Sequence, residues 1–334
     1  MTSILEDLVI PEAFPEATDD VKVVQTHISI VFIGREFVYK IKKPVNFGFL
    51  DFSTLEKRHF YCLREVELNR RFSNDLYMGV VPVFFDAGRH TMREASGEPV
   101  EYAVKMRRIS EDALMDRVFE KGALTGKAVK EIARFLAGFH SSARRGPEID
   151  IFGEPANFKI NTDENFAQVK PFIGQTIESN LYKSLHSWTE DFYQTNWDLF
   201  SARIVEGKIR DCHGDLHMQH VSLTNPIQAF DCIEFNDRFR YSDTLADIAF
   251  LLMDMEYRGG RDLAEILWDS YRKEALEEGG ESLLLFYKVY RAFVRGKVIG
   301  FTVNDKAISP DMRRRSAETA ASYFHLAESL IQSG

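Results

Sequence analysis

The sequence has few cysteines and no long apolar segment, and both absences restrict the classes of protein that fit. Its 334 residues contain only three cysteines, Cys62, Cys212 and Cys232. Because the three are odd in number and far apart, we expect free thiols in a reducing compartment, not a disulfide framework. No apolar run approaches the roughly 20 residues of a membrane span, and the N-terminus lacks the basic start of a signal peptide. The sequence predicts a cytoplasmic protein with no membrane partner.

Positive charge is also in short supply. Lys and Arg number 42 against 51 Asp and Glu, so the formal net charge is -9. This balance argues against a general nucleic-acid binder. Apolar residues are not scarce: 45% of the chain is hydrophobic and 13% aromatic, enough for two domains or one large bilobal unit.

The first third of the chain has the pattern of a small antiparallel sheet with one helix. The expected strands cover residues 28–32, 37–42, 80–85 and 101–106. Residues 54–72 are charged and contain neither Gly nor Pro, which predicts a helix capped by Asp51 or Ser53. This small lobe ends near Arg108, without a disordered linker.

The rest of the chain is predicted to be mostly helical. The expected helices cover residues 126–142, 245–256, 263–275, 282–303 and 312–332. The polar, aromatic-rich stretch that ends near Phe200 predicts no definite element. Together the two parts indicate an α+β protein.

Most of the candidate catalytic and metal-binding residues lie in one short segment. Residues 211–221 read DCHGDLHMQHV, and Gly214 interrupts any regular element there. The apolar alternation that follows predicts a hairpin around residues 224–226, which would bring Asp231 or Glu234 back beside Asp215. A loop base with a second acid on the next hairpin is how protein-kinase-type enzymes arrange a catalytic base and a metal-binding acid.

Several stretches resemble the aminoglycoside phosphotransferase and choline kinase superfamily, a branch of the protein-kinase-like fold. The matching stretches are CHGDLH at 212–217 with DIA at 247–249, VYKIKKP at 38–44, IARFLAGFH at 132–140 and IEFNDRFR at 233–240. Within this superfamily, the chain resembles bacterial proteins of aminoglycoside phosphotransferase type that sometimes occur fused to a P-loop ATPase domain. The resemblance implies a bilobal fold, with a nucleotide-binding lobe at 1–108 and a helical lobe for catalysis and substrate binding at 109–334.

The resemblance makes Asp215 the catalytic base, which accepts the substrate hydroxyl proton or orients that hydroxyl. The structural alternative is an aspartate that caps a turn. We expect His213 to fix the loop by bonding to the backbone. Asp247 opens the next helix, and in the resembled fold its role is to cap and brace the catalytic loop.

The metal-binding acid is either Asp231 or Glu234. Asp231 is slightly preferred, because a hairpin shortened by two residues keeps its side chains on the same strand face. Glu234 instead occupies the place in Ile-Glu-Phe where relatives have Ile-Asp-Phe. The family's second metal ligand is an asparagine five residues after the base, and here His220 stands in that place. Since imidazole suits softer ions than Mg²⁺, His220 raises the question of Mn²⁺.

Two lysines compete for the phosphate-binding role, because Lys40 and Lys42 share one face of a strand. We choose Lys40, since the residue two positions before it is then the apolar Val38, which can cover adenine. Its expected partner is Glu65 of the helix, with Glu67 as the alternative.

Adenine should cross a hinge from Met106 to Arg108. Phosphate binding cannot use a P-loop, because residues 122–127 (GALTGK) have the wrong spacing and Ala128 follows. Tyr287, Arg291 and Arg295 recur at helical spacing; such a row can hold an anionic substrate, but an exposed basic stripe is the more usual outcome.

The resulting hypothesis is a small-molecule kinase that uses ATP or GTP with Mg²⁺ or Mn²⁺ and phosphorylates a hydroxyl, with a P-loop ATPase as a candidate partner protein. One alternative is a pseudokinase-like module that binds nucleotide or a partner. The other is a hydrolase in which the His and Asp residues of 213–220 bind metal.

Overall fold

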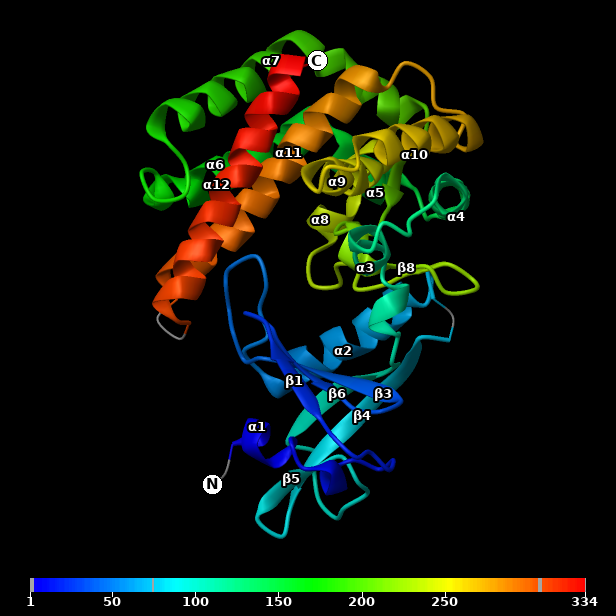
Figure 1. The fold of residues 1–334 in the computed structure, drawn as a ribbon, viewed down its shortest axis with the longest axis vertical. Coiled ribbons are helices and arrows are strands. Elements are labelled where there is room, and N and C mark those ends of the chain that lie inside the picture. Colours follow the sequence, from blue (N-terminus) through cyan, green and yellow to red (C-terminus); the bar gives the residue numbers. More distant parts are fainter. Residues whose placement is uncertain (1–2, 74, 306–307, 334) are drawn as a thin grey trace. The chain divides into compact units, whose positions relative to one another are not determined.

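The computed structural model describes residues 3–73, 75–305 and 308–333, which form two compact units (Figure 1). Unit 1 contains the described residues up to Glu120 together with His220–Asp237. Unit 2 contains Lys121–Gln219 and the described residues from Arg238 onward. The chain therefore returns to unit 1 after leaving it, whereas the sequence suggested a single boundary near Arg108. The functions assigned to the two lobes stay predictions.

Unit 1 is built on a six-stranded antiparallel sheet in the order β1-β2-β3-β6-β4-β5. The strands are β1 (Lys22–Gln25), β2 (Ser29–Ile33), β3 (Phe37–Lys42), β4 (Tyr77–Asp86), β5 (Arg89–Thr91) and β6 (Glu101–Arg107). The predicted hairpin between β2 and β3 is confirmed, with Val31 opposite Lys40. Short helical segments complete this part: α1 (Ile4–Asp7), η1 (Pro11–Ala13), η2 (Glu111–Ala113) and α3 (Met115–Glu120).

The two faces of β3 have different partners, because successive side chains of a strand point to opposite sides. Tyr39 and Ile41 join the apolar core with Phe14 and Phe32. On the other face, Lys40 and Lys42 reach helix α2 (Leu55–Asn69), which lies beside the sheet in Figure 1. The predicted cap was wrong: the side chain of Thr54 accepts the backbone N–H of Lys57 at 3.3 Å and starts α2.

The predicted hairpin near residues 224–226 is confirmed in unit 1. It follows η5 (Met218–His220) and pairs β8 (Val221–Ser222) with β9 (Gln228–Ala229). The hydroxyl of Ser73, just after α2, donates a hydrogen bond to the carbonyl of Ala229. The end of β9 is thereby held beside α2, and Asp231 follows two residues later.

The described residues of unit 2 are helical apart from one short strand pair. Its helices are α4 (Gly126–Ser142), α5 (Pro147–Asp150), η3 (Ile151–Gly153), α6 (Pro155–Val169), η4 (Lys170–Phe172), α7 (Ser179–Val205), α9 (Thr244–Tyr257), α10 (Arg261–Glu274), α11 (Glu281–Gly300), η6 (Phe301–Asn304) and α12 (Pro310–Ser333). The strand pair is β7 (Ile209–Asp211) with β10 (Tyr241–Asp243), and the short helix α8 (Asp237–Arg240) precedes β10. Helices α4, α9, α10, α11 and α12 confirm the sequence prediction, whereas α6 and α7 were missed.

Helix α9 lies at the centre of unit 2. Every residue from Thr244 to Met255 is buried, and a core that includes Phe250 and Phe293 surrounds it. Helices α11 and α12 run side by side (Figure 1). Two acidic residues of α9, Asp247 and Asp254, are therefore buried and must find partners. Among the described helices, none has both the length and the apolar composition needed to cross a bilayer.

Candidate active site

In unit 1, three residues from three different elements form a chain of ion pairs. Lys40 on β3 lies 2.9 Å from an oxygen of Glu65 on α2. The same ammonium lies 2.5 Å from Asp231, which follows β9. Glu65 is fully buried, but 40% of the Asp231 side chain is exposed. The structure thus brings together the predicted lysine, its predicted glutamate and one of the two predicted metal-binding acids.

A second pair extends this chain into the interior. Lys42 lies 2.6 Å from the other oxygen of Glu65 and also contacts Glu234. Only 1% of the Lys42 side chain is exposed, compared with 12% for Lys40. The five charged groups therefore alternate in sign, from buried Glu234 at one end to half-exposed Asp231 at the other.

The charges in this chain set the protonation of its acids. Burial would raise the pKa of Asp231, but the adjacent Lys40 and His220 outweigh it and hold the pKa below its ordinary value. Glu65 is affected in the same way: burial opposes the charge, and the two lysines lower its pKa. For Glu234 burial prevails and raises the pKa. Asp231 is the acid that stays ionised and remains open to a ligand.

The backbone at Asp231 has an uncommon conformation. Its φ is 62°, in the left-handed region that non-glycine residues seldom adopt and that recurs at functional sites. The Tyr77 hydroxyl accepts its N–H at 3.0 Å, and the Asn69 side chain accepts the N–H of Cys232 at 2.9 Å. The sequence did not single out Tyr77 or Asn69, because their role depends on a segment more than 150 residues away.

His220 lies beside Asp231, with its Nε2 3.5 Å from a carboxylate oxygen. The N–H of Phe230 donates to the His220 carbonyl at 3.0 Å, which keeps the two ends of the hairpin together. The histidine at the family's asparagine position is thus adjacent to the acid that it was expected to accompany.

The predicted hinge residues continue from β6. Met106 pairs with Val38 in the sheet register and packs near Val66 and Tyr77. Arg108 turns back toward the β2–β3 turn, where its guanidinium donates to the Gly34 carbonyl at 3.1 Å. Met106 is therefore next to the apolar residue expected to cover adenine, whereas the Arg108 side chain is engaged with Gly34.

In unit 2, two buried carboxylates of α9 hold the loop that carries Asp215. Asp247 accepts the backbone N–H groups of His213 and Gly214 at 2.7 and 2.8 Å. Two helical turns later, Asp254 accepts the N–H of Met218 at 3.0 Å. Asp247 thus braces the loop as the resemblance implied. The bracing by Asp254 was not foreseen.

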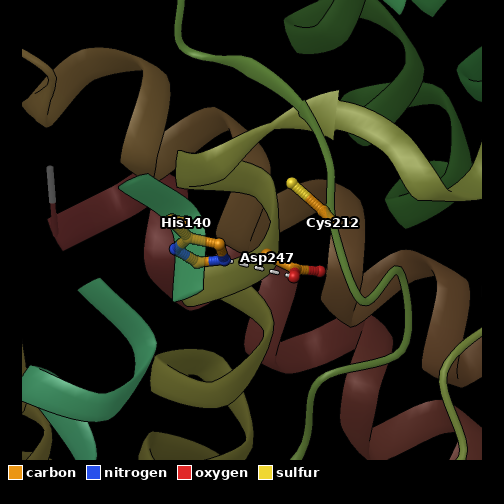
Figure 2. A group of neighbouring side chains, drawn as sticks. All are labelled: His140, Cys212 and Asp247. Carbon is orange, nitrogen blue, oxygen red and sulfur yellow. Dashed lines mark hydrogen bonds and ion pairs between the residues drawn. The ribbon is translucent and has the colours of Figure 1, made fainter. Parts of the chain in front are cut away.

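Figure 2 shows Asp247 together with His140 and Cys212, a group whose ligand atoms lie within 4.8 Å of one another. Each of them already has a protein partner: His140 contacts Asp247 at 3.3 Å and the Tyr271 hydroxyl at 2.8 Å. The Cys212 thiol donates to a carbonyl, and burial raises its pKa well above the ordinary value, which disfavours the thiolate that binds metal. This group therefore fits a structural brace better than a metal site.

Asp215 lies at the exposed side of the braced loop, with 35% of its side chain accessible. Its backbone N–H donates to the His213 ring at 3.3 Å, as expected for a loop-fixing histidine. The His217 ring nitrogen lies 3.7 Å from the carboxylate. The fully buried His213 ring is thus occupied in holding the loop, which argues against a metal cluster that uses it.

The prediction of an exposed basic stripe on α11 was wrong. Tyr287 and Arg291 are both buried. Arg291 donates to the carbonyls of Gly214 at 2.9 Å and Ala246 at 3.1 Å, which ties α11 to the Asp215 loop. Tyr287, Arg291 and Arg295 do recur at helical spacing on α11. Whether this face of the helix is exposed to solvent depends on the packing of α9 and the Asp215 loop against it.

With this geometry in view, comparison with known sequences identifies the class. The chain belongs to the phosphotransferase enzyme family, whose model matches residues 61–283. It is 34% identical over 275 residues to uncharacterized proteins of Mycobacterium tuberculosis and Mycobacterium bovis. The match covers 82% of this chain but 53% of each relative, so the chain spans about half the length of the curated relatives it matches.

Solved structures share the fold. The GDP complex of aminoglycoside 2'-phosphotransferase-IIIa is 14% identical, with 97% of this chain and 99% of that chain covered and a TM-score of 0.53. A choline/ethanolamine kinase family protein from Mesorhizobium loti is also 14% identical, with 99% and 98% covered and a TM-score of 0.50. The predicted α+β protein-kinase-like fold is confirmed.

Proposed function

We propose that this protein is a kinase that transfers the γ-phosphoryl group of ATP or GTP to a hydroxyl group of a small molecule. The observation that carries the proposal is the ion-paired set of Lys40, Glu65 and Asp231, which a phosphotransferase needs for its nucleotide and metal. Membership of the phosphotransferase family supports it. The donor nucleotide and the acceptor are the finer parts of the proposal.

In this proposal Lys40 binds the phosphates of the donor nucleotide, and Glu65 orients the Lys40 ammonium group. Asp231 would hold the divalent ion, and His220 would supply a nitrogen ligand. The residues fit such an ion, because an ionised, half-exposed carboxylate is a suitable ligand for Mg²⁺ or Mn²⁺. When bound, the ion would neutralise charge on the phosphate oxygens. Glu234 is assigned a structural role with Lys42, since both are buried.

Asp215 is the proposed base. Its carboxylate accepts the proton of the acceptor hydroxyl while that oxygen bonds to the γ-phosphorus, and the bond from phosphorus to the nucleoside diphosphate breaks. The bracing of the loop by the α9 carboxylates fixes the position of this carboxylate before substrate binds. Met106 is the proposed contact for adenine. The Arg108 side chain would have to leave Gly34 to join it, so we assign Arg108 only a backbone role. Neither the family nor the fold supports a P-loop ATPase partner.

A nucleotide-binding module without catalysis is the second candidate. The feature that favours it is His220, which replaces the asparagine expected at the metal and lies 3.5 Å from Asp231. A kinase assay separates the two functions, because a module without catalysis binds nucleotide but forms no phosphorylated product.

A thermal-shift series with ATP or GTP and Mg²⁺ or Mn²⁺ tests the nucleotide site. A ligand that binds only the native state should raise the melting temperature. Lys40→Met should abolish this shift, whereas the exposed Lys127→Met should leave it unchanged. A kinase assay on a panel of hydroxyl metabolites then tests transfer. The proposal fails if no purine nucleotide at millimolar concentration changes the melting temperature.

A further inference from the structure

We infer that the polar surface where α6 meets α11, formed by Asn165, Gln168 and Lys297, binds an anionic group of the phosphoryl acceptor. The acceptor would then be a hydroxyl compound that also carries a carboxylate, phosphate or sulfate group. This inference rests on the proposed kinase function. It concerns unit 2 alone.

The first observation is the set of partners of Lys297. Its ammonium donates to the side-chain oxygens of Asn165 at 2.6 Å and Gln168 at 2.9 Å, and both are neutral amides. Among the described residues, no carboxylate forms an ion pair with it; the nearby Glu164 is paired with Arg238 at 2.6 Å. Burial lowers the pKa of Lys297 to about 8, as expected for an ammonium without an adjacent anion. The site therefore has one positive charge that the described residues do not neutralise.

The second observation is an amide donor beside this charge. A lysine ammonium only donates hydrogen bonds, so the Asn165 oxygen must face Lys297 and the Asn165 nitrogen must point elsewhere. That nitrogen is buried and makes no hydrogen bond of ordinary geometry among the described residues, although the Tyr290 hydroxyl lies near enough to interact with it. Since buried polar groups are nearly always paired, this nitrogen is available to the Tyr290 hydroxyl or to a bound acceptor. An anion bound here would accept from both Lys297 and Asn165.

The third observation relates this surface to the proposed base. Tyr290 and Lys297 are seven residues apart and share one face of α11. Burial raises the pKa of Tyr290, but Arg291 and Arg238 act in the opposite direction, which places both guanidinium groups near its hydroxyl. Arg291 also donates to the carbonyl of Gly214, the residue before Asp215. Lys297 lies six residues beyond Arg291, about 9 Å further along the helix axis and about 120° around it.

The sign of the charge selects the class of acceptor. A cationic acceptor, such as an amino alcohol, would meet the Lys297 ammonium and the neighbouring guanidinium groups. The nearby carboxylate of Glu164 is neutralised by Arg238. A hydroxy acid or a sugar phosphate would instead supply an acceptor and a partner for Lys297.

The test is amine labelling of the 334-residue chain, with sulfate, gluconate and ethanolamine as probes. At pH 8 the free-amine fraction of Lys297 should far exceed that of an ordinary lysine, so Lys297 should acetylate early; the groups that face it are Glu164 on α6 and Arg238 on α8. Sulfate and gluconate should slow its acetylation, because an anion favours the charged form, and ethanolamine should not. Equal labelling with and without 20 mM of either acid overturns the inference.

Variants give an independent measurement. Lys297→Met should weaken gluconate binding, followed by calorimetry, by roughly tenfold or more, the usual effect of losing a charged hydrogen bond. The matched control is Lys288→Met on the same helix, because Lys288 already pairs with Glu256 at 2.6 Å. The affinity of this variant for gluconate should equal that of the wild type. Equal affinity in the wild type and Lys297→Met contradicts the inference. Nucleotide-induced thermal shifts in both variants report separately on the kinase proposal.

Discussion

Two fully buried carboxylates, one in each unit, are stabilised in different ways. Glu65 in unit 1 has two lysine ammonium groups as partners. Asp247 in unit 2 accepts two backbone N–H groups and contacts His140. A lysine can exchange a carboxylate for the phosphates of a ligand, whereas backbone donors in a loop cannot leave. The comparison indicates that unit 1 has contacts suited to exchange on binding, and that unit 2 has contacts suited to a fixed geometry.

The largest effect on stability is expected from removing Lys42, the inner lysine of unit 1. Lys42→Met leaves Glu65 and Glu234 buried beside each other without their shared cation. We expect a loss of about 3–5 kcal/mol in the free energy of unfolding, the usual cost of breaking a buried pair. Denaturant titration measures it.

The matched variant is Lys42→Met combined with Glu234→Gln, which should recover part of the loss because the excess buried charge is gone. Lys40→Met should cost less stability, since its second partner Asp231 is half-exposed. If Lys42→Met is as stable as the wild type, the inner pair does not support the site.

Replacing the proposed base, which lies on the braced loop of unit 2, should affect activity and not nucleotide binding. Asp215→Asn should lower phosphoryl transfer by roughly 100-fold or more, the usual contribution of a positioned base. The nucleotide-induced thermal shift should persist, because Asp215 is not among the residues proposed to bind nucleotide. Steady-state kinetics on an acceptor found in the panel measures the effect, and full turnover by Asp215→Asn would show that the base lies elsewhere.

The Asp247 carboxylate, which braces the Asp215 loop in unit 2, should contribute to the stability of the fold through its charge. Asp247→Asn replaces one acceptor oxygen by an NH₂ group that cannot accept the His213 N–H. We expect a loss of about 1.5–3 kcal/mol, typical of a hydrogen bond to a charged group. The exposed Asp262→Asn on α10 serves as the control and should stay within about 0.5 kcal/mol of the wild type. A change in Asp247→Asn as small as in this control would exclude the bracing role.

Acid should remove the same contribution. Burial would raise the pKa of Asp247, but His140, His213 and Arg291 hold it below its ordinary value of 3.8. A carboxyl group with a lowered folded-state pKa stabilises the fold above its unfolded-state pKa, and this stability is lost as the pH falls below it. The difference in unfolding free energy between the wild type and Asp247→Asn should therefore shrink from about pH 5 toward pH 2. A constant difference would mean that the charge of Asp247 does not matter.

The smallest expected effect concerns the metal in unit 1. Mn²⁺ accepts a mixed nitrogen and oxygen shell more readily than Mg²⁺ does. If His220 binds the ion with Asp231, activity should favour Mn²⁺, and His220→Asn should move the preference a few-fold toward Mg²⁺. The ratio of rates with the two ions in the wild type and the variant measures this. An unchanged ratio in folded His220→Asn removes the histidine from the metal site.

Elements with a clear apolar stripe were predicted well, and those without one were missed. Helix α4 was predicted with its observed bounds, because Val129, Ile132 and Leu136 recur at helical spacing and are buried. Helices α6 and α7 have their apolar and aromatic residues spread around the axis, and α7 is kinked at Asn196. Their helical state depends on packing against α11, which no local pattern contains.

The sequence by itself determined the fold class and predicted the candidate site residues, because strand alternation, helix spacing and the CHGDLH segment are local patterns. The sequence favoured Lys40 over Lys42 because of Val38, but only the tertiary structure showed that Lys42 is the more buried of the two. It also placed Asp231 beside Lys40, Glu234 beside Lys42, and Arg291 against the Asp215 loop. The physical reason is the same in each case: burial and ion pairing depend on residues far away in the chain, so a local pattern cannot specify them.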